Sequence, residues 1–175
     1  CKKGNLHLIE QLVNLEDICG EINIHADEEF PFLIACEKQY MHIIDKLLQL
    51  EKTHEKIDIH VENDIIFRYA CKSRNLVTIN KLLELEETHG KIDIHSKDDI
   101  IFQNACEKGH LDIINKLLEL EKTHGKIHNR MWKNFEYACS NGHLHIVEKL
   151  LQLEKTRGKI DIHSFHEYPF SNACS

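Results

Sequence analysis

The sequence has no apolar run long enough to cross a membrane. A membrane-spanning helix needs roughly 18 or more mainly apolar residues, and polar or charged residues interrupt every apolar stretch well before that length. The given sequence has neither an initiating methionine nor a secretory signal peptide, and it starts at Cys1 in the middle of a repeat, so we expect any targeting segment to lie outside it. We therefore expect no contact with membranes, and we expect the chain to be a segment of a longer protein.

Basic residues are in the minority. The 22 Lys and Arg residues are outnumbered by 29 Asp and Glu residues, which leaves a formal net charge of -7. Binding to nucleic acid needs clustered Lys and Arg that face the phosphates. The charge balance therefore argues against nucleic acid as the main partner.

Catalytic motifs are absent as well. The sequence contains no Gly-rich phosphate loop, no Gly-x-Ser-x-Gly and no His-Glu-x-x-His. We expect no catalytic residue, no cofactor and no metal site, so the chain is not expected to be an enzyme.

What the sequence does contain is an even spacing of cysteines. Neighbours in the series are 35, 35, 35, 33 and 35 residues apart: Cys1, Cys36, Cys71, Cys106, Cys139 and Cys174. A disulfide framework or a metal centre needs no such regularity, whereas a repeat protein does. The spacing predicts one array over residues 1–175, with units at about 1–35, 36–70, 71–105, 106–138 and 139–173 and the start of a sixth.

Rare residues fall at fixed places in this repeat. The glycines form one series at a turn, Gly4, Gly109 and Gly142, and another at a helix end, Gly20, Gly90, Gly125 and Gly158. Such recurring glycines are typical of backbone positions with positive φ. Gln39 and Arg74 replace the turn glycine, and Glu55 replaces the helix-ending one.

Each unit is predicted to hold two helices and a connector. A short helix surrounds the Phe-x-x-Ala-Cys motif, as at residues 100–108, and a longer one with a wide apolar face follows, as at residues 110–123. The alternating Ile92, Asp93 and Ile94 then indicate a brief extended segment.

These motifs resemble the ankyrin-repeat family. The resemblance rests on Gly-His-Leu at 109–111 and 142–144, on Ile-Val-x-x-Leu-Leu at 146–151, and on the Pro-Phe-x-x-Ala-Cys segments ending at Cys36 and Cys174. It implies an all-α solenoid of helix–turn–helix units with β-hairpin-like fingers. The family's Thr and His in the short helix are absent here, which removes the usual polar ties between repeats. The Lys-Ile-Asp-Ile-His connector is similar to that of ankyrin proteins from giant amoeba-infecting DNA viruses, mimivirus-like in kind.

The resemblance implies a non-catalytic protein–protein interaction scaffold with a concave surface of fingers and short helices. Two alternatives stay open: an ankyrin segment of a larger protein whose activity lies elsewhere, and a structural spacer. The partner is expected to be another protein. The chain is expected to be monomeric and to reside in a reducing intracellular compartment, the host cytoplasm if the source is viral.

Candidate partner-binding residues lie where the units differ, at the finger tips and on the short helices. The first three tips are acidic, which favours either a basic partner or simple solubility. The fourth is two residues shorter and carries the only Trp, which either anchors a partner or fills the gap left by the deletion. The candidates are Asp64, Asp98, Asp99, Arg130, Met131, Trp132, Phe165, His166, Tyr69 and Tyr137.

Histidines also form series, His54, His89 and His124 in one and His25, His60, His95 and His163 in another. Packed helices lie about 10 Å apart, so each series is expected to be a ladder and not a metal cluster. A response of these ladders to pH stays open.

Overall fold

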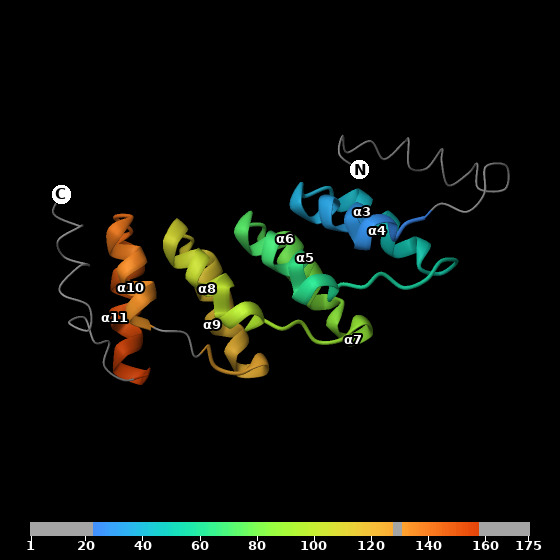
Figure 1. Cartoon of the computed structure of the whole chain (residues 1–175). Helices are drawn as coiled ribbons and strands as arrows, with labels where there is room; N and C mark the ends of the chain where they lie inside the picture. Colours follow the sequence, from blue (N-terminus) through green and yellow to red (C-terminus); the bar gives the residue numbers. More distant parts are fainter. Residues whose placement is uncertain (1–22, 128–130, 158–175) are drawn as a thin grey trace. The chain divides into compact units, whose positions relative to one another are not determined.

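The computed structural model describes residues 23–127 and 131–157, and the chain divides into two compact units, residues 1–92 and 93–175. The first unit contains α3 (Ala26–Glu37), α4 (Met41–Leu50), α5 (Val61–Lys72), α6 (Leu76–Glu84) and α7 (Glu86–His89) (Figure 1). The second contains α8 (Ser96–Lys108), α9 (Leu111–His124), α10 (Met131–Ser140) and α11 (Leu144–Arg157).

Within each unit the helices pack as stacked hairpins. In the first, α3 packs against both α4 and α5, and α5 packs against α6; in the second, α8 packs against both α9 and α10, and α10 packs against α11. The short helices of successive repeats therefore lie side by side, as Figure 1 shows within each unit. The all-α repeat architecture is confirmed, and α9 matches the predicted long helix to within one residue. In the described ranges no helix is long and apolar enough to span a membrane.

The connectors have the predicted alternation but not the predicted pairing. Ile57 and Ile59 are buried, whereas Lys56 before them and Asp58 between them are exposed. Residues 23–127 and 131–157 contain no strand, so the β-hairpin-like fingers are not confirmed. Side chains hold the connector backbone in place instead, as when Glu51 Oε1 accepts the Ile57 N–H at 3.0 Å.

The core repeats with the sequence. Each short helix buries a phenylalanine together with small residues that let neighbouring helices approach closely. Full burial of one phenylalanine side chain contributes about 1.5–3 kcal/mol, so this series is a principal source of stacking energy. The buried series are Phe32, Phe67, Phe102 and Phe135; Ala35, Ala70, Ala105 and Ala138; and Cys36, Cys71 and Cys106.

The cysteines behave as buried apolar residues. The four described ones are free thiols, and all but Cys139 are buried. Burial raises the pKa of the Cys36, Cys71 and Cys139 thiols and raises that of Cys106 to about 12. Such thiols are neutral at physiological pH and are poor nucleophiles and poor metal ligands.

The turn between the helices of each hairpin requires positive φ. Gly109 and Gly142 have φ of 73° and 70°, and Gln39 and Arg74 adopt the same left-handed conformation with φ of 61° and 57°. The alignment of these two residues with the glycines is therefore confirmed.

In α3, α5 and α8 the three residues before the right-handed part of the helix are also left-handed, which the sequence pattern did not predict. Their φ values lie between 48° and 65°. A left-handed residue other than Gly costs roughly 1–2 kcal/mol, less for Asn and Asp, so other contacts must hold these segments. We call them the tips: Asp27–Glu28–Glu29, Glu62–Asn63–Asp64 and Lys97–Asp98–Asp99.

Candidate functional site

Each tip has two exposed residues and one buried carboxylate. The last residues, Glu29, Asp64 and Asp99, are 6%, 4% and 6% exposed. The first two of each tip, including Asp98, are exposed. Of the three aspartates predicted to bind a partner, Asp98 is therefore exposed, whereas Asp64 and Asp99 are buried. A charged side chain is expected at the surface, but here a histidine makes a hydrogen bond to each carboxylate and so allows it to be buried.

The buried carboxylate of each tip is bound by the histidine four residues earlier. The Nδ1 atoms of His60 and His95 lie 2.6 Å from the Oδ1 atoms of Asp64 and Asp99. The equivalent distance from His25 Nδ1 to Glu29 Oε1 is 2.7 Å. This contact closes the left-handed turn together with a backbone bond between the same two residues, such as Asp99 N–H to the His95 carbonyl at 3.0 Å.

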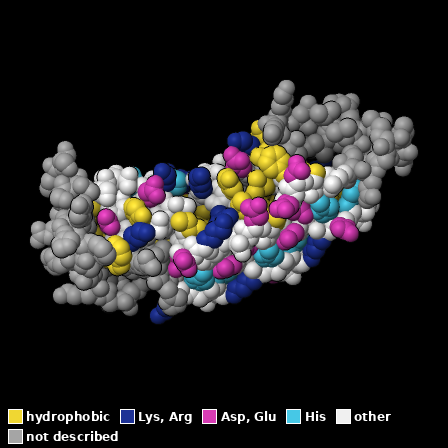
Figure 2. Space-filling model, in the orientation of Figure 1, with side chains coloured by type: hydrophobic (Ala, Val, Ile, Leu, Met, Phe, Trp, Pro, Cys, Tyr) yellow, Lys and Arg dark blue, Asp and Glu magenta, His cyan; other side chains and the backbone are white. Residues whose placement is uncertain are grey.

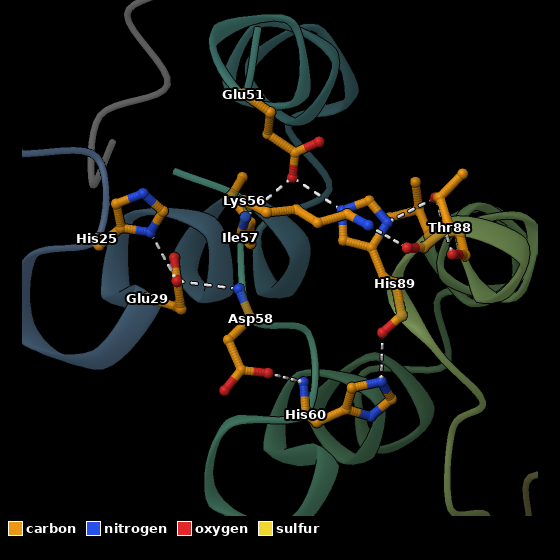
Figure 3. Close-up of polar contacts among 10 residues, drawn as sticks. His25, Glu29, Glu51, Lys56, Ile57, Asp58, His60, Thr88 and His89 are labelled. Atoms are coloured by element: carbon orange, nitrogen blue, oxygen red, sulfur yellow. Dashed lines mark hydrogen bonds and ion pairs between the residues drawn. The ribbon is translucent and has the colours of Figure 1, made fainter. Parts of the chain in front are cut away.

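Two of these histidines also reach the next connector. His60 Nε2 lies 3.0 Å from the carbonyl oxygen of His89, and His95 Nε2 lies 3.0 Å from that of His124. Figure 3 shows His60 beneath the His89 carbonyl, at the point where α7 ends. We call each three-residue set a histidine clamp: His60, Asp64 and His89, and His95, Asp99 and His124.

Further polar contacts join the connectors of the first unit. Glu51 Oε1 accepts from His89 Nε2 at 2.8 Å, and Lys56 Nζ donates to the Thr88 carbonyl (Figure 3). The Asp58 N–H donates to Glu29 Oε1 at 3.0 Å, which ties the first tip to the following connector.

A second set of ties lies at the turns. Asn75 is buried and donates through Nδ2 to the Cys36 carbonyl at 3.3 Å, while its Oδ1 caps α6 by accepting the Thr78 N–H. In the second unit His143 Nε2 donates to the Glu107 carbonyl at 3.0 Å. Polar ties between repeats are thus present, at other positions than the family's usual ones.

The predicted partner-binding residues on helices are only half exposed. Tyr69 and Tyr137 are half-buried, with Lys72 Nζ 5.8 Å and Lys133 Nζ 5.7 Å from the respective ring centroids. Trp132 at the start of α10 is half-buried. Arg130, Phe165, His166 and the side chain of Met131 lie outside the described residues.

Hydrophobic side chains accompany the acidic tips in the first unit. Phe30 is 36% exposed, and Leu33 one turn later is partly exposed. Figure 2 shows hydrophobic and acidic side chains gathered on the viewed face of this unit, near α3 and α5. The surface therefore offers both charge and apolar area.

The clamps were missed from the sequence, although a signal for them exists. A carboxylate follows the histidine after four residues in each case: His25 and Glu29, His60 and Asp64, His95 and Asp99, and His163 and Glu167. Among the described residues no three His, Cys, Asp or Glu side chains lie close enough to hold a metal ion.

Comparison with protein families identifies this architecture. A family model for ankyrin repeats, in three copies, matches residues 67–164, which is 98 of the 175 residues. The chain belongs to the ankyrin-repeat family, whose members are generally protein–protein interaction modules and typically non-catalytic. No curated protein and no solved structure matches the chain significantly, so no relative supports the similarity to viral ankyrin proteins.

Proposed function

We propose that this chain is a non-catalytic scaffold that binds a protein on its tips and on the exposed side of its short helices. Membership of the ankyrin family supports the general role. The observation that carries the proposal further is the build of the tips. Each presents exposed polar residues on a strained turn that is held from beneath by a buried carboxylate and a histidine.

The chemistry of the tips favours a basic partner segment with apolar residues. Asp27, Glu28 and Glu62 are exposed in the first unit, and Phe30 directly follows the first tip. Opposite charge speeds association and selects the partner, whereas aromatic area supplies binding energy. In the second unit, we propose Trp132 and Arg130 as anchors of the same partner.

The test is a charge reversal that the fold already tolerates. Lys97 occupies in the third tip the position that Asp27 and Glu62 occupy in the first two. The variant Asp27→Lys with Glu62→Lys therefore reverses two exposed charges at a place that accepts Lys. Its control is Glu84→Lys with Glu87→Lys, which makes the same change in net charge at exposed positions of α6 and α7.

We expect the partner protein to bind the wild type and the control equally well and to bind the tip variant at least about tenfold more weakly. The reason is that the charge reversal removes charge complementarity at the interface. Trp132→Ala tests the second anchor in the same way. Equal capture by all variants would argue against the tips, and no specific capture at all would favour a structural spacer.

We further propose a monomeric state and a reducing intracellular compartment, the host cytoplasm if the source is viral. Free buried thiols at Cys36, Cys71 and Cys106 support this setting, because disulfides are rare in reducing compartments.

A further inference from the structure

The two histidine clamps share a geometry that depends on protonation. In each, Nδ1 faces a carboxylate oxygen at 2.6 Å and Nε2 faces a carbonyl oxygen at 3.0 Å. A carbonyl and an ionised carboxylate are acceptors only, and a neutral imidazole has a single N–H. Only the imidazolium form can therefore make both hydrogen bonds.

We propose that His60 and His95 are proton-dependent clamps that fix the tips against the following connector, so that pH controls the order of the surface that binds the partner. The control of binding rests on the proposed function; the clamps themselves do not. Because His60 and His95 belong to different units, each clamp acts within its own unit.

Loss of the proton breaks one bond in either tautomer. If Nδ1 keeps its hydrogen, the lone pair of Nε2 faces the carbonyl oxygen of His89 or His124. If Nε2 keeps it, the lone pair of Nδ1 faces the buried carboxylate at 2.6 Å, which is the costlier arrangement because that group is charged. Deprotonation should therefore release the bond to the connector.

The surrounding charges favour the imidazolium. Burial lowers the pKa of His60, but hydrogen bonds to Asp64 and to the His89 carbonyl, together with the charges of Asp64 and Asp58, raise the pKa above its ordinary value. For His95, burial likewise lowers the pKa. Hydrogen bonds to Asp99 and to the His124 carbonyl, together with the charges of Asp99 and Asp93, raise the pKa above its ordinary value. The side chain of Asp64 is buried, so solvent screens this pair less than an exposed one.

A third, incomplete site shows what a clamp requires. His25 Nδ1 binds Glu29, but its Nε2 atom is buried without a hydrogen-bond partner in the described part of the chain. The complete clamps have glycine 30 residues after the histidine, at Gly90 and Gly125, where the first site has Glu55.

The glycine has a conformational role at both positions, and at Gly90 it has a steric role as well. Gly90 and Gly125 adopt φ of 98° and 94° with ψ of 162° and 161°, a region essentially restricted to Gly. A Cβ at position 90 would lie 3.1 Å from His60 Nε2, whereas a Cβ at position 125 would lie 3.5 Å from His95 Nε2, which is an ordinary contact. A clamp therefore needs both the histidine and the glycine.

The test is a site-resolved NMR titration of the histidine rings in the whole chain. We expect His60 and His95 to titrate above about 6.5, the ordinary value. Asp64→Asn should lower the pKa of His60 by about one unit or more, the usual effect of removing a charge in contact. The control Glu62→Gln removes an equally charged but exposed group from the same tip and should have a clearly smaller effect. A wild-type pKa of His60 at or below the ordinary value, or equal effects of the two variants, would overturn the clamp.

A second measurement keeps the proposal testable if Asp64→Asn does not fold. This measurement is amide hydrogen exchange in the wild type, at the tips and at residues 90–94, corrected for the intrinsic exchange rates. We expect the corrected exchange rate to increase about fivefold between pH 6 and pH 8.5, because loss of one hydrogen bond changes the opening equilibrium by about that factor. Unchanged exchange would contradict the proposal.

Partner capture at the same two pH values separates this proposal from the proposed function. Weaker capture at pH 8.5 supports control of the surface by the clamps, and equal capture refutes that control while the scaffold role stands. If the histidines titrate as expected and no protein is captured at any pH, the scaffold role fails and the clamp stands as a property of the fold.

Discussion

At the scale of single residues, Gly109 and Gly142 occupy the same turn position in different surroundings. Their φ values are 73° and 70°, so any side chain adds similar strain at both. A Cβ at position 109 would lie 2.7 Å from His143 Nδ1, whereas at position 142 nothing lies within 4 Å. His143 could yield only by giving up its hydrogen bond to the Glu107 carbonyl.

The two alanine substitutions should therefore differ in cost. We expect Gly142→Ala to lower the free energy of unfolding by about 1 kcal/mol, the cost of left-handed strain. Gly109→Ala should cost about 1 kcal/mol more, because a hydrogen bond is lost as well. Urea unfolding of both variants measures the difference. Equal destabilisation would mean that the His143 contact contributes nothing to stability.

Some residues could be interpreted correctly from spacing alone, and others could not. The left-handed conformation of Gln39 and Arg74 was predictable, because a fixed place in a repeat imposes its backbone geometry on whatever residue stands there. The burial of Asp64 and Asp99 was not, because it depends on a histidine and on a carbonyl from another helix end. Charge by itself suggests solvent, and only the three-dimensional partners reverse that expectation.

At the scale of helices, the repeats differ in the residue that follows the last helical turn. α9 runs for 14 residues to His124 and stops at Gly125. α4 ends after 10 residues at Leu50. The position equivalent to Gly125 in this repeat is occupied by Glu55. Helix content was thus predictable from the apolar pattern, but the end of α4 was not, because α6 also ends at Glu84 although Gly90 follows it. What Gly90 and Gly125 supply is a final φ of 98° and 94°, a conformation that Glu cannot readily adopt.

Restoring this glycine should complete the third clamp. In Glu55→Gly, we expect the helix to extend towards His54 and its carbonyl to reach His25 Nε2, as the His89 carbonyl reaches His60. The gain should be about 1 kcal/mol at pH 6, the net worth of one hydrogen bond. Chemical unfolding measures it.

Glu55→Ala is the matched control for this gain. It removes the same carboxylate but cannot adopt the glycine conformation, so it should not stabilise the chain. Equal stabilisation by Ala and Gly would assign the effect to the lost charge and not to a new helix end.

At the scale of the whole molecule, the clamps predict a direction for the dependence of stability on pH. The pKa of His60 and of His95 is raised in the folded chain, so the folded state binds protons more tightly than the unfolded state. Their stabilising effect is complete below the unfolded value of about 6.5 and is lost as the pH rises through the raised folded values. The free energy of unfolding should therefore fall over this window, by about 1 kcal/mol for each clamp as its connector hydrogen bond is released.

A second cause would give a fall of the same sign and has to be separated from the clamps. The formal net charge is -7 with neutral histidines, so loss of protons from any of the 14 histidines increases the self-repulsion of the chain. Repulsion between exposed charges is screened at 0.5 M salt, whereas the contact between His60 and the buried Asp64 is screened much less. We expect urea unfolding to retain most of its pH dependence at high salt and to lose it in His60→Gln with His95→Gln. A dependence that disappears with salt, or that survives both substitutions, would assign the effect to net charge, and the clamps would then have no energetic role in the array.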